Sequence, residues 1–274
     1  MNTDPLPAFC FTHIGKRLYH EDNFLFDGKY LETDEQNHLS NRQLFCITTT
    51  RFHRVNYFAI SDGMGGHNAG EVASRICVEK LAGLKNLIQN CSNIKEAVTL
   101  FQLAIAEINA AVCEMSRSHT ELKGMGATLV LFVVCGTENA VLNIGDSRAY
   151  YFNFNDDTLT QITKDNTEGQ RMLDLGLLTR KELVGFPARK NLNRYIGYGQ
   201  SGFVLQADEY YPVLGNGILT LCSDGISDSL SDNEISEILR STNDLESAGK
   251  RLIEEAVAAH DADNATAILI PVRG

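Results

Sequence analysis

The stretch Phe58-Ala-Ile-Ser-Asp62-Gly63-Met64-Gly65-Gly66 guides the interpretation of the whole sequence. An apolar run typical of a strand ends here in an aspartate, and three glycines follow before a helical pattern begins at Ala69. Glycine lets the backbone turn sharply, so that a carbonyl oxygen can approach a metal ion. An ordinary strand-to-helix loop is the alternative, whereas a phosphate-binding P-loop is excluded because the Gly-Lys-Ser/Thr ending is missing.

Three further aspartates, Asp146, Asp224 and Asp263, lie at an end of an apolar strand pattern. Each of them alone could simply start a turn. Several carboxylates gathered at the ends of sheets repel one another, however, unless they are protonated or bridged by cations. Mg²⁺ or Mn²⁺ is the simplest bridge between oxygen ligands. The acidic pair Glu21-Asp22, between two strand patterns, adds further candidate ligands.

The remaining pattern predicts a layered α+β fold. Short apolar or β-branched runs indicate strands at residues 9–12, 24–26, 44–50, 57–61, 128–135, 140–144, 149–154, 203–211, 218–222 and 266–271. Apolar residues at helical spacing indicate helices within 69–88, 98–115 and 245–257, and capping boxes at Thr179 and Ser231 begin two more. This order of elements favours layers over alternating βαβ units. Without a break in composition, residues 1–274 are expected to form one domain, with an exposed, irregular insertion at about 165–202.

Composition and charge exclude several classes of protein. The 274 residues are 43% hydrophobic and 22% charged, which is enough apolar material for a core. Asp and Glu outnumber Lys and Arg by 35 to 24, so nucleic acid is not an expected partner. The longest apolar run, residues 127–135, is too short for a bilayer, and the first residues carry no export signal. We therefore expect a cytoplasmic protein without a membrane partner.

Seven cysteines are scattered along the chain without a Cys-x-x-Cys pair. Most lie in apolar patterns, which predicts buried, reduced thiols. A redox or zinc site is the alternative interpretation.

The ordered set of motifs resembles the metal-dependent serine/threonine protein phosphatases of type 2C, especially their bacterial branch. The matching segments are Arg17-Leu-Tyr-His-Glu21-Asp22, Ser61-Asp-Gly-Met-Gly-Gly-His67, Gly126-Ala-Thr128, Ile144-Gly-Asp-Ser-Arg148, Leu159-Thr-Gln-Ile-Thr-Lys-Asp165, Asn191-Leu-Asn-Arg-Tyr-Ile-Gly197, Ser223-Asp-Gly-Ile-Ser-Asp228 and Asp263-Asn264. They span nearly the whole chain in the family's order, and eight weak motifs in sequence make an accidental match very improbable.

The resemblance implies a four-layer α-β-β-α sandwich of two antiparallel sheets flanked by helix pairs, with a metal cleft at one end. It also implies a role for each matching residue. Asp62 would bridge two Mn²⁺ or Mg²⁺ ions, with the Gly63 carbonyl on the first ion and Asp224 and Asp263 on the second. Glu21 and Asp22 would hold metal-bound waters. Asp146, Asp224 and Asp228 would bind a third, looser ion, and Arg17 would grip the substrate phosphate.

The implied activity is hydrolysis of phosphoserine and phosphothreonine in proteins, by attack of a hydroxide that bridges two metal ions. Phosphoproteins made by a Hanks-type kinase are the expected substrates. A catalytically silent scaffold of the same family and a phosphatase of small phosphoesters are the alternatives. The sequence leaves the oligomeric state open.

Several positions depart from the family's pattern or have a second interpretation. Met64 stands where some relatives carry a histidine that could act as a general acid, His20 replaces an asparagine, and Asn166 replaces a histidine. His67 is interpreted as structural or solvent-facing rather than catalytic. Arg148 is interpreted as a structural partner of a nearby acid.

Two segments remain to be assigned. The basic residues Arg189, Lys190 and Arg194, in or beside the insertion, would contact acidic or phosphorylated parts of a substrate or form a solvated face. The polar connection from Gly28 to Arg54 is a hairpin or a loop.

Overall fold

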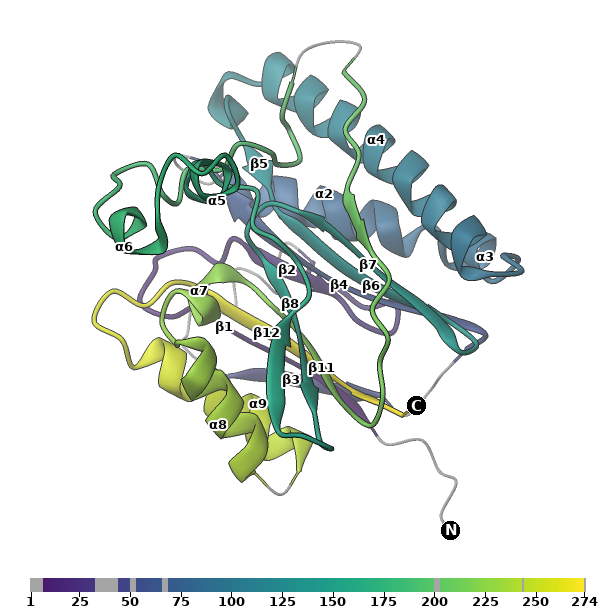
Figure 1. Ribbon diagram of the computed structural model, residues 1–274. Coiled ribbons are helices and arrows are strands. Elements are labelled where there is room, and N and C mark those ends of the chain that lie inside the picture. The colour runs from purple at the N-terminus through teal and green to yellow at the C-terminus, as the bar shows by residue number, and fades with distance from the viewer. Residues whose placement is uncertain are drawn as a thin grey trace.

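The computed structural model describes residues 7–32, 44–49, 53–65, 69–199, 203–242 and 244–273. Within these ranges two antiparallel sheets face each other, and helices cover the outer side of each sheet (Figure 1). The layers therefore follow the order helix, sheet, sheet, helix. This arrangement confirms the α+β class and the four-layer sandwich.

The first sheet brings the two ends of the described chain together. Its order is β3-β1-β12-β11-β8-β9. The strands are β1 (Ala8–His13), β3 (Phe45–Thr49), β8 (Arg148–Asn153), β9 (Thr158–Gln161), β11 (Gly217–Cys222) and β12 (Ala265–Val272). β12 lies between β1 and β11, and its Thr266 is directly opposite Thr12 of β1. Side chains from the start and the end of the chain can therefore meet at one end of this sheet.

The second sheet carries the aspartate of the glycine-rich stretch. Its order is β10-β7-β6-β4-β2, and the short strand β5 pairs with the end of β4. The strands are β2 (Asp22–Leu25), β4 (Val55–Met64), β5 (Gly126–Ala127), β6 (Leu129–Cys135), β7 (Glu138–Ile144) and β10 (Asp208–Tyr210). In the antiparallel pairing of β2 with β4, Asp22 lies opposite Asp62. The two acids that the sequence places apart are therefore neighbours.

Three apolar layers hold the four structural layers together. Phe101 of α4 (Ile94–Ser118) packs with α2 (Gly70–Ala82) against the second sheet, and Leu252 of α9 (Leu245–Val257) packs with α8 (Asp232–Ser241) against the first. Between the sheets, Phe24, Phe132 and Leu221 belong to one buried cluster. By length and composition alone α4 could cross a bilayer. In this structure, however, one face of α4 belongs to the apolar layer outside the second sheet.

Short helices lie beyond these layers. They are α3 (Lys85–Ile88), α5 (Glu168–Asp174), α6 (Arg180–Leu183) and α7 (Asp224–Ser227). The capping boxes predicted at Thr179 and Ser231 are present and begin α6 and α8. The helical pattern within 69–88 is divided, because α2 ends at Ala82 and α3 starts at Lys85. Both α5 and α6 lie at the same end of the sandwich as α7 (Figure 1).

The strand predicted at 203–211 is mostly wrong. Residues 203–207 form no strand, and only β10 pairs with β7. Side chains take the backbone groups that a ladder would use: Gln102 bonds both the amide and the carbonyl of Ala207, and Arg194 donates to the carbonyl of Gln206. The short strand β9 was not predicted, because Leu159 is its single apolar residue.

The cysteines largely follow the prediction. All seven are free, and six of them are buried, whereas Cys46 on the edge strand β3 is exposed. β3 itself lies in the connection from Gly28 to Arg54, of which residues 33–43 and 50–52 lie outside the described ranges.

Candidate metal centre

Thr128 fixes the backbone of Asp62 at the end of β4. The Asp62 amide donates to the Thr128 hydroxyl at 3.0 Å, and the Thr128 amide donates to the Asp62 carbonyl at 2.8 Å. The Thr128 hydroxyl also lies 2.6 Å from the hydroxyl of Ser147, the residue directly before β8. Asp62 is thus held at a fixed place where β4 passes the turn that contains Asp146.

Gly63 allows the chain to cross itself beside Asp62. A Cβ on Gly63 would lie 2.1 Å from the carbonyl oxygen of Gly70, the first residue of α2. The Gly63 amide donates to the Glu21 carbonyl at 3.1 Å, so the loop before β2 is tied to the same point. A side chain here would push α2 and the Glu21 loop apart, so only glycine fits.

Asn264 holds the loop that carries Arg17, Glu21 and Asp22. Its side-chain oxygen accepts from the Glu21 amide at 2.7 Å. Its amide nitrogen donates to the carbonyls of Ile14 at 2.8 Å and Tyr19 at 3.1 Å. With three hydrogen bonds to one loop, Asn264 is a site-building residue for which the sequence analysis gave no individual role.

Asp22, the first residue of β2, is completely buried. Ser223 and Thr266 donate to its Oδ2 atom at 2.7 and 2.6 Å. His20, the departure from the family's asparagine, is also buried, with Nε2 2.9 Å from the hydroxyl of Thr12. Burial, with the nearby His13, lowers the pKa of His20 to about 3, so the ring is neutral.

The other predicted acids come from three separate turns. Asp146 lies between β7 and β8, Asp224 begins α7 directly after β11 and Ser223, and Asp263 precedes β12. A Cβ on Gly225 would lie 1.9 Å from the carbonyl oxygen of Asn264, so α7 begins against the backbone next to Asp263. Asp228 follows α7 and is exposed. Together with Glu21-Asp22 and Asp62, five parts of the sequence thus bring their carboxylates to one end of the sandwich.

Burial and mutual repulsion raise the pKa values of five of these carboxyls. Burial is the main cause at Asp62, where the pKa lies well above its usual value, and the charge of Asp224 raises it further. Burial likewise raises the pKa of Glu21 to about 7, of Asp22 to about 7, of Asp146 to about 8 and of Asp224 to about 6. The carboxyls of Asp62 and Asp224 lie close enough for each to shift the pKa of the other. In metal-free protein the cluster therefore holds protons that a cation would displace.

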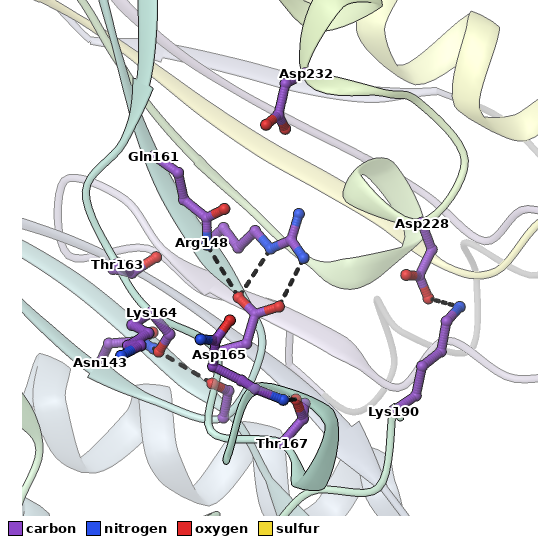
Figure 2. A network of polar contacts seen from close by, with 12 residues as sticks. Asn143, Arg148, Gln161, Thr163, Lys164, Asp165, Thr167, Lys190, Asp228 and Asp232 are labelled. Carbon is purple, nitrogen blue, oxygen red and sulfur yellow. Dashed lines mark hydrogen bonds and ion pairs between the residues drawn. The ribbon is translucent and has the colours of Figure 1, made fainter. Parts of the chain in front are cut away.

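Two cationic side chains pair with acids at the rim of the cluster. Arg17 forms an ion pair with Asp263, and Lys190 forms one with Asp228 (Figure 2). Among the described residues no three histidine, cysteine or acidic side chains converge as one ligand group, so water and backbone oxygens would have to complete a coordination shell. Mg²⁺ commonly keeps several waters and takes only one or two carboxylates. The all-oxygen donor set therefore fits Mg²⁺ or Mn²⁺.

This sequence and this fold have known counterparts. The sequence model of the protein phosphatase 2C family matches residues 47–259. The chain belongs to this family. A serine/threonine phosphatase Stp of Listeria monocytogenes is 31% identical over 211 residues, which cover 77% of this chain and 82% of that protein.

Solved structures of 2C-type phosphatases have the same fold. The serine/threonine phosphatase PstP/Ppp of Mycobacterium tuberculosis gives a TM-score of 0.76 at 27% identity, covering 98% of this chain and 100% of that one. The catalytic domain of PstP in complex with two manganese ions gives a TM-score of 0.73, again at 27% identity over 98% of this chain and 100% of that one. The resemblance to bacterial phosphatases of this family is confirmed.

Arg148 is a structural residue in this member of the family, as the sequence predicted. Its guanidinium donates two hydrogen bonds to Asp165, at 2.9 and 2.6 Å (Figure 2), and a third to the Tyr150 hydroxyl at 2.9 Å. Gln161 also donates to Asp165. The network joins β8 and β9 to the start of the segment that leads to α5.

Asn166, the second departure from the family's pattern, ties the same segment to the metal centre. Its side-chain oxygen accepts from the Gly145 amide at 2.9 Å, and its amide nitrogen donates to Asp208 at 2.9 Å. The Asn166 amide donates to the Gly145 carbonyl. Because Gly145 precedes Asp146, the position of the segment and that of the aspartate are coupled.

The basic residues of the insertion have different environments. Arg194 donates to Asp208 at 2.9 Å, and Lys190 pairs with Asp228. Arg189 is exposed and lines a cleft of about 420 Å³ together with Arg180 of α6, which the sequence analysis did not single out. Asp146, Asp224 and Asp228 line the same cleft, so it opens onto the acidic cluster.

Met64 and His67 are the two remaining predicted positions that follow Asp62 in the sequence. Met64 ends β4 opposite Gly126, where its thioether offers no proton for transfer. His67 lies outside the described residues, so its assignment stays a prediction.

Metal ions should stabilise the protein most at mildly alkaline pH. The folded-state pKa values of Glu21, Asp22, Asp146 and Asp224 lie above their usual values, so the native state binds more protons than the unfolded state. Their contribution to stability is present below about pH 4 and is lost as pH rises to about 8. Thermal melts in chelator should therefore show this loss. Mn²⁺ at about 100 times its Kd should add about 2.7 kcal/mol to the free energy of unfolding.

For a chain of this size, that free energy corresponds to a Tm increase of about 5–10 °C. Melts with added Mn²⁺ are compared with melts in chelator. Both series use the same protein concentration and a buffer free of Ca²⁺. An unchanged Tm with excess Mn²⁺ at about pH 8 would show that the carboxylates do not form a cation site.

Proposed function

We propose that this protein hydrolyses phosphoserine and phosphothreonine in proteins, with two divalent cations, Mn²⁺ or Mg²⁺, at the acidic cluster. The observation that carries the proposal is the gathering of carboxyls from distant segments: Asp22 lies opposite Asp62, and Asp146, Asp224 and Asp228 line one cleft. The charge of Asp224 and of Asp146 raises the pKa of Asp62, so these groups are close together. Two bound cations would supply a hydroxide at neutral pH and positive charge for the phosphoryl oxygens. The manganese ions of the PstP catalytic domain support this choice of metal.

The proposal gives each acid a role. Asp62 would hold both ions, the Gly63 carbonyl would bind the first, and Asp224 and Asp263 would bind the second. Glu21 and Asp22 accept hydrogen bonds from waters of the two ions. A third ion would use Asp146, Asp224 and Asp228, and Lys190 would have to leave Asp228 for that ion to bind.

Arg17 is the proposed phosphate-binding residue. Its side chain is 56% exposed at the rim of the cluster, and its pairing with Asp263 keeps the guanidinium beside the acids. A guanidinium can donate two parallel hydrogen bonds to a phosphate, which would orient the phosphoryl group. When Asp263 turns to a cation, Arg17 becomes available to the substrate.

The direct test is metal-dependent release of phosphate from a phosphoserine or phosphothreonine peptide. Wild-type protein in Mn²⁺ should release phosphate, and chelator should stop the reaction. Absence of release from phosphopeptides and from para-nitrophenyl phosphate would favour the scaffold. Faster hydrolysis of small phosphorylated metabolites than of any phosphopeptide would favour the small-phosphoester phosphatase.

We extend the proposal to the cellular setting. Residues 1–274 would form a single catalytic domain with a flap-like insertion at about 165–202, and the enzyme would act in the cytoplasm. There it would reverse the action of a Hanks-type serine/threonine kinase. Deletion of its gene should increase phosphothreonine in the soluble fraction, and a change confined to other fractions would contradict the cytoplasmic assignment.

The cleft beside the cluster should help to bind protein substrates. Arg180 and Arg189 line it without a described ion-pair partner, whereas Lys190 and Arg194 are paired. Replacing both arginines with alanine should raise KM for an acidic phosphopeptide about tenfold, because two charge-assisted contacts are lost. KM for para-nitrophenyl phosphate should hardly change. Equal effects on the two substrates would show that the arginines do not contact the peptide.

A further inference from the structure

A chain of buried hydrogen bonds runs from His20 to Asp22 beneath the metal centre. His20 Nε2 lies 2.9 Å from the Thr12 hydroxyl, and that hydroxyl lies 2.7 Å from the Thr266 hydroxyl. Thr266 in turn donates to Asp22 Oδ2 at 2.6 Å. The exposed fractions are 3% for His20 and 0% for the other three residues, so bulk water does not compete for these bonds.

The register of the first sheet builds this chain. Thr12 on β1 and Thr266 on β12 are directly opposite each other in the antiparallel pair, which brings their hydroxyls together. Asp22 begins β2 in the second sheet, and His20 lies two residues before it. The chain of hydrogen bonds therefore crosses from one sheet to the other below the acidic cluster.

The direction of these bonds is set by the acceptor at one end. Asp22 Oδ2 accepts from both the Ser223 and the Thr266 hydroxyl, so the Thr266 hydroxyl proton goes to Asp22. The Thr266 oxygen then accepts from Thr12, whose only hydroxyl proton is used in that bond. The Thr12 oxygen must accept from His20, which requires a proton on Nε2.

The other ring nitrogen agrees with this tautomer. Within the described part of the chain, His20 Nδ1 is buried and has no hydrogen-bond partner. A buried N–H without an acceptor is rarer and more costly than an acceptor left without a donor. The proton therefore belongs on Nε2, the nitrogen that faces Thr12.

We propose that His20 is a positioning residue that acts on Asp22 through Thr12 and Thr266. Its Nε2 proton fixes the direction in which the Thr12 and Thr266 hydroxyls donate. Thr266 therefore always donates to Asp22 and holds its carboxylate in one orientation. Without this donor, the Thr12 and Thr266 hydroxyls can reverse, and Thr266 can turn its proton away from Asp22. This inference rests on the proposed role of Asp22 in holding the waters of the metal ions.

The first test is a double-mutant cycle on the affinity for Mn²⁺, measured by calorimetry with chelator-stripped protein. His20→Phe and Thr12→Val should each weaken Mn²⁺ binding about tenfold, the lower end of the loss seen when a residue behind a metal ligand is removed. The double variant should be no weaker than either single variant, because both break the same chain. His20→Gln, which keeps a donor, should bind Mn²⁺ nearly as well as wild type.

Thr220→Val is the matched control. Thr220 lies on β11, the neighbour of β12, is 2% exposed, and its hydroxyl has no described hydrogen-bond partner. The same chemical change should therefore leave Mn²⁺ affinity unchanged. Additive losses in the cycle, or equal losses in Thr12→Val and Thr220→Val, would overturn the proposal.

The second test uses unmodified protein and does not depend on activity. Nitrogen NMR shifts of the His20 ring should show a neutral ring with its proton on Nε2, whereas a proton on Nδ1 would overturn the proposal. A wild-type protein that binds Mn²⁺ but hydrolyses no phosphoester would contradict the proposed function alone. The proposed role of His20 would still be tested by the tautomer of its ring and by the double-mutant cycle.

Discussion

Replacing Asp62 with asparagine is expected to lower kcat on a phosphopeptide at least about a thousandfold, the upper end of the loss when one electrostatic group is removed from an active site. The proposed bridging position needs a carboxylate with two charged oxygens, and asparagine offers one neutral oxygen. Mn²⁺ binding measured by calorimetry should weaken together with kcat. The remaining activity should not recover at high substrate concentration.

The same variant should stay folded. Burial and the charges of Asp224 and Asp22 raise the pKa of Asp62 well above its usual value, so replacing its carboxyl with an amide of the same shape removes repulsion from the metal-free cluster. The Tm in chelator should therefore be equal to or higher than that of wild type. Asp261→Asn is the matched control, because that carboxylate is 94% exposed and lies two residues from Asp263. If Asp62→Asn kept more than about a tenth of wild-type kcat, its bridging role would be wrong.

Replacing Arg148 with methionine is expected to cause the largest loss of stability. The side chains of Arg148 and Asp165 are only 22% and 15% exposed, and the pair makes two direct hydrogen bonds. Removing one member of such a pair leaves a buried charge uncompensated, which costs about 3–5 kcal/mol. Chemical unfolding should show this loss, and Tm should fall by about 6–20 °C.

Arg171→Met provides the comparison. Arg171 pairs with Glu168 on the exposed face of α5, where its side chain is 49% exposed. Exposed pairs of this kind contribute about 0–1 kcal/mol. The double variant Arg148→Met with Asp165→Leu should regain part of the stability, because no buried charge is left. Equal losses in Arg148→Met and Arg171→Met would show that the hydrogen bonds of Arg148 to Asp165 and Tyr150 do not stabilise the fold.

The acids of the site could be predicted because an aspartate at the end of an apolar strand is unusual. Asp62, Asp146 and Asp224 each interrupt a strand pattern, and their side chains remain at one end of the sandwich. Their convergence could not be derived from spacing alone. It depends on pairings between distant segments, such as Asp22 opposite Asp62 and Thr12 opposite Thr266, which no sequence pattern indicates. Only the resemblance to a known family implied that the acids meet in one cleft.

The supporting residues were harder to predict, because their partners are backbone groups or distant side chains. Asn264 after an aspartate looks like part of a turn, yet it clamps the loop from Ile14 to Glu21. Lys190 was predicted to contact a substrate or to form a solvated face, yet it pairs with Asp228, far along the chain. Strand propensity at 203–207 failed for the same reason, since side chains of Gln102 and Arg194 bind that backbone.

The most direct test of the account is the anomalous diffraction of manganese in crystals grown with Mn²⁺. We predict two strong peaks, one on each side of the Asp62 carboxylate, with Asp224 and Asp263 contacting the second. Arg17 should then have turned away from Asp263. Peaks elsewhere, or an empty cleft at saturating Mn²⁺, would contradict the claim that these distant carboxylates form one metal centre.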